Sequence, residues 1–243
     1  MISSSAVVDI HTHLYELKDD KTKLNSIDKE DYISTALTKE EVKWHLSNAI
    51  PYWIAGAFPD MASCYSEMLQ VVEELAQNGS IIGIGEIGLD KRFGNLELQK
   101  RLFISQLDIA QRVKLPVIIH CVGYYYELFE LIKRSNLHTI IILHGFKGSI
   151  EIFNKFKSLN LFFSLSHRLL DSDKYSEVVK EILVSERFFI ESDYPFNGEL
   201  DEVNVILEAI SVKYSYRMDN LKDILIRNQR KLIEERVGTI SKK

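Results

Sequence analysis

Two histidines separated by one residue lie in the first apolar run of the chain. The run, "VVDIHTHL", contains His11 and His13, and Asp9 precedes His11 by two positions. Side chains alternate between the faces of a β-strand, so these three polar groups would point to the same side. Polar groups aimed the same way from a buried strand need a shared partner. Taken alone, an H-x-H pattern is also compatible with histidines in a turn or on the surface.

More histidines and carboxylates stand at the ends of other apolar runs. They are Glu86 and Asp90 in "GEIGLD", His120 in "PVIIHC", His144 in "LHGF", and Glu191 and Asp193 in "IESDYP". Each could be a buried side chain satisfied by hydrogen bonds, but their joint occurrence favours a metal site. Imidazole nitrogen with carboxylate oxygen suits divalent cations such as zinc, manganese or magnesium, and no cysteine lies among these residues.

The number of these side chains exceeds what one tetrahedral zinc ion requires. A carboxylate has two oxygens and can bridge two metals, and paired ions about 3.5 to 4 Å apart are a common device for hydrolysing phosphoesters and amides. Two divalent cations against Glu86 and Asp193 would leave a formal charge of about +2. An acidic protein could therefore still attract an anionic phosphodiester.

Short runs rich in Val, Ile and Phe alternate along the chain with segments of helical periodicity. The candidate strands are residues 6–14, 32–37, 52–59, 81–90, 116–122, 139–146, 161–166 and 188–195. Near-continuously apolar strands that alternate with helices indicate a parallel sheet buried on both faces. Eight such units in 243 residues predict an α/β fold, a closed (β/α)8 TIM barrel, forming a single domain over residues 1–243. The charged segment 18–31 is too short and polar for a full helix, so we expect the first helix to be reduced to a turn or lost.

The carboxyl ends of parallel strands meet at one rim of such a barrel. Active sites are built at this rim because its loops vary freely while the strand ends fix side-chain positions. The candidate metal-binding residues all fall at predicted carboxyl ends. We therefore expect them to converge on one mouth of the barrel.

The composition bears on partners and location. A net charge of −5 argues against a broad basic surface that wraps nucleic acid, although a local cationic site remains possible. No apolar run approaches the roughly 20 residues needed to cross a bilayer, and no basic segment followed by an apolar one opens the chain. We therefore expect a cytoplasmic protein with no membrane partner. Cys64 and Cys121 lack disulfide-framework or zinc-site spacing, and we expect both to be reduced.

Together these motifs resemble the TatD family of metal-dependent deoxyribonucleases, a branch of the amidohydrolase-like barrels. "DIHTHL" is similar to the family's D-x-H-x-H-L opening, "GEIGLD" to its G-E-x-G-L-D, "PVIIHC" to its P-V-x-x-H, "LHGFKGS" to its x-H-x-F-x-G, and "IESDYP" to its E-T-D-x-P. Order and spacing agree over residues 6–235, and "RNQRKLI" resembles the asparagine-containing final helix of the family. The resemblance implies a barrel of the metallo-dependent hydrolase type.

The resemblance also implies a set of ligands for two divalent cations (Zn²⁺, Mg²⁺ or Mn²⁺). His11 and His13 would hold one ion together with Asp193. His120 and His144 would hold the second, and Glu86 would bridge the two. As catalytic residues, Glu86 would join the metals and Asp193 would orient or deprotonate the attacking water. Asp9 and Glu191 would fix the orientation of the imidazoles.

The family's activity implies a hydrolase that cleaves DNA phosphodiester bonds, here from a single-stranded or frayed 3′ end. The departures from the family pattern fall on parts that contact substrate. Phe58 in "GAFP" stands where the family has histidine, Val122 stands where an arginine commonly follows His120, and the loop after Asp193 is short and acidic. The metal ligands are therefore intact while the phosphate contacts are altered.

Other residues could replace the altered contacts. A small basic rim could come from Lys91, Arg92, Lys147 and Arg168, and bases could stack on Tyr124, Tyr125 and Tyr126. The same residues could be solvated loop charges and the start of a helix. His167 could line the mouth, but we leave it out of the metal site.

Two other functions remain open. One is a metal-dependent hydrolase of another ester or amide, because this barrel serves many substrates. The other is a metal-stabilised binding subunit of a multiprotein bacterial system of the defence type. The complete ligand set favours an enzyme, because a scaffold would not need Asp193 together with Glu86.

Overall fold

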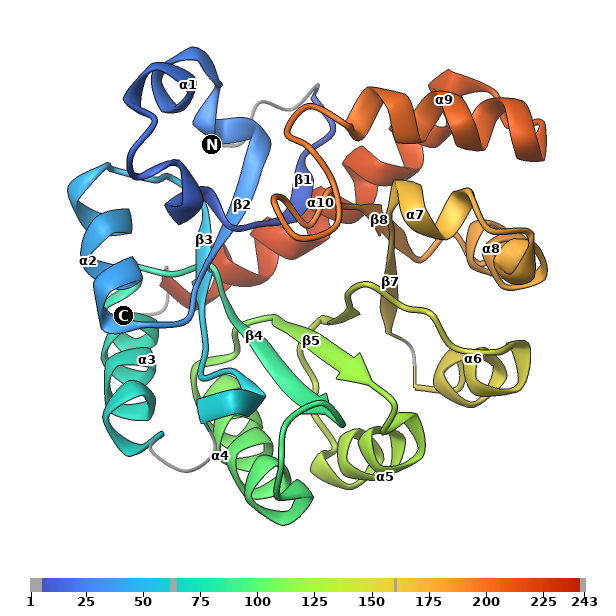
Figure 1. Cartoon of the computed structure of the whole chain (residues 1–243). Helices are drawn as coiled ribbons and strands as arrows, with labels where there is room; N and C mark the ends of the chain where they lie inside the picture. Colours follow the sequence, from blue (N-terminus) through green and yellow to red (C-terminus); the bar gives the residue numbers. More distant parts are fainter. Residues whose placement is uncertain (1–5, 62–64, 160, 241–243) are drawn as a thin grey trace.

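The computed structural model describes residues 6–61, 65–159 and 161–240. Within them, eight parallel strands close into a barrel in chain order, and β1 completes the ring by pairing with β8 (Figure 1). The strands are β1 (Asp9–Thr12), β2 (Tyr32–Ala36), β3 (Trp53–Ala55), β4 (Gly83–Asp90), β5 (Val117–Val122), β6 (Ile141–Leu143), β7 (Phe162–Leu165) and β8 (Phe188–Ile190). Each segment predicted as a strand contains one of them, so the TIM barrel is confirmed.

Helices alternate with the strands and surround the barrel (Figure 1). They are α1 (Lys21–Ser26), α2 (Lys39–Ser47), α3 (Ser66–Asn78), α4 (Leu96–Val113), α5 (Tyr125–Ser135), α6 (Ile150–Lys157), α7 (His167–Leu170), α8 (Ser176–Ser185), α9 (Val203–Tyr214) and α10 (Met218–Ile240). As predicted, the first helix is reduced: α1 has six residues, between 3-10 turns at Leu14–Leu17 and Lys29–Asp31. Only Leu24 of α1 is buried, so this polar helix has little apolar surface to pack on the barrel.

Several strands are shorter than predicted at their carboxyl ends. The runs 6–14, 139–146 and 188–195 were expected to be strands throughout, but β1, β6 and β8 end at Thr12, Leu143 and Ile190. Beyond β8 the main chain still bonds irregularly to the β1 segment, through Asp193 N to His11 O and His13 N to Tyr194 O. The polar residues at these ends therefore lie at the start of rim loops.

Apolar side chains fill the inside of the barrel. One cluster gathers residues from strands all around the ring, including Ile10, Ile54, Ile118 and Phe189. Because these strands lie on different sides of the ring, their side chains meet in the barrel interior. This cluster ends below the polar residues at the carboxyl ends of the strands.

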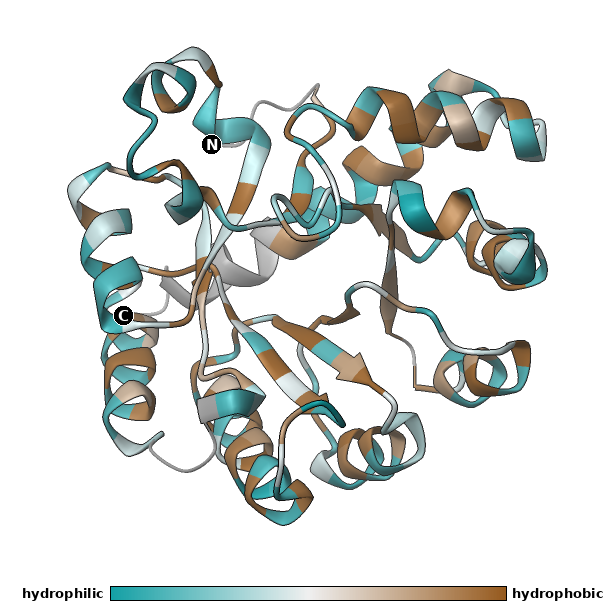
Figure 2. Ribbon diagram, in the orientation of Figure 1, coloured by the Kyte–Doolittle hydropathy of each residue, from teal (hydrophilic) through white to brown (hydrophobic). Residues whose placement is uncertain are grey.

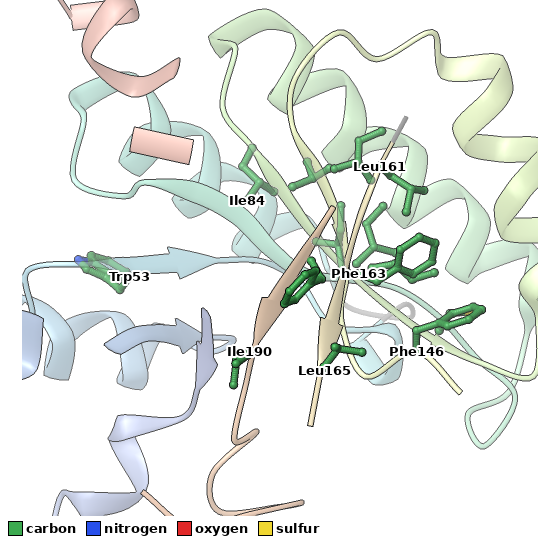
Figure 3. Close-up of a cluster of buried hydrophobic side chains, with 14 of the residues drawn as sticks. Trp53, Ile84, Phe146, Leu161, Phe163, Leu165 and Ile190 are labelled. Atoms are coloured by element: carbon green, nitrogen blue, oxygen red, sulfur yellow. The ribbon is translucent and has the colours of Figure 1, made fainter. Parts of the chain in front are cut away.

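A second, larger cluster lies between the barrel wall and the helices. It includes Trp53, Phe146, Phe163 and Leu165, which Figure 3 labels. The rings of Phe146 and Phe163 are 5.0 Å apart. Hydrophobic and hydrophilic residues accordingly alternate along the surrounding helices (Figure 2). Apolar residues on both sides of the wall explain the near-continuously apolar strand sequences.

Helix α10 covers the amino end of the barrel and passes behind the strands in Figure 1. Gln229 accepts a hydrogen bond from Val8 N at 3.2 Å and donates one to Ala6 O at 3.1 Å. Asn228 donates to Phe188 O at 3.0 Å, and Leu232 packs into the interior cluster. Because this end is covered, the carboxyl ends of the strands form the open end of the barrel.

None of the described helices is both long enough and apolar enough to span a bilayer. Cys121 is a buried free thiol, and its burial raises its pKa to about 12. Cys64 lies outside the described residues.

The close pairing of β4 with β5 depends on Gly88. A Cβ at this position would lie 1.9 Å from His120 O, and the φ of Gly88 is +151°. We expect Gly88→Ala to lower the free energy of unfolding by about 3 kcal/mol or more, because the strands would have to separate. The midpoint of urea unfolding measures this change. Gly94→Ala is the control, because nothing lies within 4 Å of its added Cβ; equal loss in both variants would contradict the explanation.

Candidate metal centre

The predicted metal ligands lie together at the carboxyl end of the barrel. His11, Glu86 and His120 stand on β1, β4 and β5. His13 and His144 directly follow β1 and β6, and Asp193 lies three residues beyond β8. All of these side chains are buried.

The carboxylate of Glu86 lies at the centre of the group. Its Oε2 is 3.4 Å from His11 Nε2 and 3.7 Å from His13 Nε2. Its Oε1 is 2.7 Å from His120 Nδ1 and 2.8 Å from His144 Nε2. The two oxygens of one carboxylate therefore face two different pairs of histidines.

Asp193 faces the first of these pairs. Its Oδ1 lies 3.7 Å from His11 Nε2 and 3.8 Å from His13 Nε2. The other oxygen accepts a hydrogen bond from the side-chain amide of Asn197. The residue has a φ of +54°, so the loop turns sharply here rather than continuing β8. This turn directs Oδ1 back towards the histidines.

The donor set fits a divalent cation. Ligand atoms of His11, His13 and Asp193 lie within 4.8 Å of one another, as do those of His11, Glu86 and His144. Among the described residues, Nε2 of His11 is buried without a hydrogen-bond partner. A buried polar atom left unpaired costs free energy, and a metal ion would satisfy it.

The electrostatics of the cluster also favour a cation. Burial alone would raise the pKa of Glu86, but the charge of His144 and hydrogen bonds from the surrounding imidazoles hold this pKa well below its ordinary value. Despite burial, Glu86 raises the pKa of His144 well above the usual range. Burial lowers the pKa of His13 to about 3, so its ring is neutral at pH 7 and has a lone pair to donate. Metal binding would therefore displace protons from the cluster.

Two further carboxylates lie behind imidazole rings of the cluster, and one of them is within hydrogen-bond distance of its ring. Asp90 Oδ2 lies 2.9 Å from His120 Nε2, and the guanidinium of Arg92 donates to the same carboxylate. Glu191 Oε2 lies 3.6 Å from His144 Nδ1 and accepts a hydrogen bond from Ser164 at 2.6 Å. Such partners fix ring orientation and increase the basicity of the metal-facing nitrogen. The sequence interpretation assigned this role to Glu191 but missed it for Asp90.

Asp9 differs from the sequence expectation. Its carboxylate accepts hydrogen bonds from His11 N at 3.2 Å and Ser192 N at 3.1 Å, rather than orienting an imidazole. The register of β1 shifts between Asp9 and Thr12, so simple alternation does not describe this strand. Burial raises the pKa of Asp9 to about 7. Asp9 thus joins the backbone of β1 to the segment after β8.

Aromatic rings border the cluster on two sides. The ring of Phe58 lies 4.9 Å from that of His120 and 5.8 Å from that of Phe93. The ring of Phe196 lies 4.9 Å from that of His13. Sequence reasoning singled out Phe58 but missed Phe196, whose only signal was an aromatic residue three positions after Asp193.

Of the other residues proposed to contact substrate, some lie on the surface and one packs against the core. Arg92 and Arg168 are exposed, and Arg168 donates to Asn197 Oδ1 at 3.1 Å, next to Asp193. Lys91 packs its alkyl chain over Gly123. By contrast, the ring of Tyr125 packs on Phe146, on the core side of α5.

Comparison with known proteins identifies the family. The sequence pattern of the TatD related DNase family matches residues 8–235. The chain belongs to the TatD family. The uncharacterized metal-dependent hydrolase YabD of Bacillus subtilis (strain 168) is 27% identical over 223 residues, which are 86% of this chain and 80% of that protein. The 3'-5' ssDNA/RNA exonuclease TatD of Escherichia coli (strain K12) is 28% identical over 149 residues, 58% of this chain and 57% of that protein.

Solved structures of TatD proteins share the fold. The TatD homologue YJJV from Escherichia coli K12 superposes with a TM-score of 0.79 at 23% identity, covering 95% of this chain and 98% of the other. A TatD family hydrolase from Entamoeba histolytica gives a TM-score of 0.75 at 18% identity, over 93% and 97% of the two chains. The family and the clustered ligands identify the chain as a metal-dependent hydrolase acting on ester bonds.

Metal binding should stabilise the fold. At a free metal concentration of about 100 times Kd, we expect about 2.7 kcal/mol of stabilisation, a rise in Tm on the order of 5–10 °C. Thermal unfolding of chelator-treated protein, with and without zinc, manganese or magnesium, measures the rise. Glu86→Gln should remove most of it. Glu74→Gln, at an exposed position of α3, is the control. If metal raised the Tm of Glu86→Gln as much as that of the wild type, Glu86 would not be a central metal ligand.

Asp90 should matter for metal affinity through His120. We expect Asp90→Asn to weaken metal binding about 10- to 100-fold, because the amide does not hold the ring as the carboxylate does. Competition with a coloured chelator measures the affinity. Arg92→Gln keeps the contact between Asp90 and His120 and should have a smaller effect. Equal losses in the two variants would mean that charge at the rim, not ring orientation, is responsible.

Proposed function

We propose that this chain is a two-metal phosphodiesterase that removes nucleotides from the 3′ end of single-stranded DNA. The observation that carries the proposal is the position of Glu86, whose Oε1 and Oε2 face separate histidine pairs. A carboxylate placed in this way is suited to bridge two cations. A site for one ion would not require a second histidine pair.

Each ion would have its own ligands besides Glu86. His11, His13 and Asp193 would hold one, and His120 and His144 the other. Their nitrogen and oxygen donors accept zinc, manganese or magnesium. When bound, the ions would polarise the scissile phosphate and favour ionisation of the attacking water.

Asp193 would act on the attacking water. One of its oxygens is held by Asn197, which leaves Oδ1 directed at the histidines. We assign to Oδ1 the role of orienting the water and accepting its proton. The loop geometry supports this role, because the turn at Asp193 is closed by a hydrogen bond from Asn197 N to Asp193 O at 3.0 Å.

Arg92 would supply positive charge for the phosphate. Its side chain is 60% exposed while its guanidinium donates to Asp90, which in turn contacts His120. The guanidinium is therefore fixed near one half of the metal centre and remains open to solvent. It would replace the arginine that is missing at Val122.

The names of two relatives support the proposed direction of cleavage and the single-stranded substrate. The Escherichia coli relative is named a 3'-5' ssDNA/RNA exonuclease, and a relative from Schizosaccharomyces pombe is named Deoxyribonuclease Tat-D.

The decisive assay is shortening of a 5′-labelled single-stranded DNA with magnesium, manganese or zinc. We expect progressive loss of 3′ nucleotides, which EDTA abolishes, and at least about a 100-fold lower rate for Asp193→Asn. Asp219→Asn, on the exposed start of α10, is the control. No shortening with any metal, in protein shown to bind metal, would refute the proposed function.

The apolar rings at the mouth favour a second candidate, hydrolysis of a less charged ester or amide. Phe58 and Phe196 contact metal-facing histidines, and neither offers a hydrogen bond to phosphate oxygens. A panel of carboxyl esters, lactones and acylated amines, tested beside the DNA, separates the two candidates by relative kcat/KM.

A further inference from the structure

Phe196 is an exposed aromatic residue at the metal centre. It lies in the loop between β8 and α9, and the residue is 60% exposed. Its ring meets that of His13 at 4.9 Å and 81°, edge against face. Single exposed apolar residues are common on protein surfaces, so exposure alone says little. Contact with a metal-facing histidine places this ring within reach of any substrate at the centre.

Hydrogen bonds close the loop that carries Phe196. Asn197, the next residue, donates both its backbone N–H and its side-chain amide to Asp193. Arg168 donates to Asn197 from α7 at 3.1 Å. The backbone at Phe196 is therefore bonded to Asp193 of the metal centre, and the ring lies against His13.

The other aromatic candidates do not offer such a surface. Phe58 is partly buried, with its ring against His120 and Phe93. Tyr126 is 57% exposed, but it lies on α5 with Lys155 Nζ 5.4 Å from its ring centroid, away from the histidines. Of the aromatic residues described above, Phe196 alone combines exposure with contact to the centre.

We propose that Phe196 is the stacking surface for the nucleobase of the nucleotide being removed. The inference rests on the proposed function and names a base-binding subsite within it. Every base has a π-face, and a phenyl ring makes no hydrogen bonds to base edges, so the subsite accepts all four bases. A base must leave its neighbours to stack on the ring, which selects an unpaired 3′ end. Arg168 lies beside the same loop and is placed to meet a backbone phosphate.

The test compares two 3′ ends on one oligonucleotide. Single strands that end in a normal nucleotide or in an abasic one are cleaved by the wild type, Phe196→Ala and Phe196→Trp. The readout is the ratio of kcat/KM for the two ends. We expect Phe196→Ala to lower this ratio roughly 5- to 100-fold, the range measured for loss of one base–aromatic stack, and Phe196→Trp to retain it.

Tyr126→Ala is the matched control, because it removes an aromatic side chain of similar exposure from α5. It should leave the ratio as in the wild type. If Phe196→Ala cleaves DNA with the same ratio of kcat/KM for the two ends as the wild type, the base-binding subsite is refuted and the proposed function stands. A wild type that cleaves neither end with any metal would overturn the proposed function, and the subsite with it.

Discussion

A buried carboxylate among four imidazoles is the constraint on which the rest of the site depends. Glu86 can stay charged in this environment because His120 and His144 contact its Oε1, while His11 and His13 face its Oε2. Strand β4 can approach β5 closely only where it carries glycine. A Cβ on Gly85 would lie 2.8 Å from Ile118 O, and a Cβ on Gly88 would clash with the backbone of His120. The glycines of β4 are thus a consequence of where Glu86 must lie.

The carboxylates behind the histidines extend this constraint outwards. Asp90 holds His120 and is itself held by Arg92, while Glu191 lies against His144 and is held by Ser164. In a medium of low dielectric, such a network stabilises its charges only when every member is paired. The positions of these two rings therefore depend on the carboxylates of Asp90 and Glu191, which lie behind them.

The sequence predicted the barrel and the grouping of the candidate ligands because both follow from regular patterns: apolar runs alternating with helices, and polar residues at carboxyl ends. It did not predict features that depend on tertiary contacts of loops. The end of β8 and the turn at Asp193 depend on bonds to the β1 segment, such as His13 N to Tyr194 O. The role of Asp9 follows from a register shift, and the position of Phe196 from the turn that Asn197 closes. Period-two alternation contains none of this information.

The cover formed by α10 has a consequence for biosynthesis. Gln229 bonds to the backbone of Val8 across 221 positions of chain, and Asp193 of the last strand segment bonds to His11 of the first. The ring can therefore close only after the ribosome has released the segment that follows β8. Until then, His11 and His13 cannot share a cation with Asp193. A hydrolase built in this way cannot complete its candidate metal centre until the segment that carries Asp193 has left the ribosome.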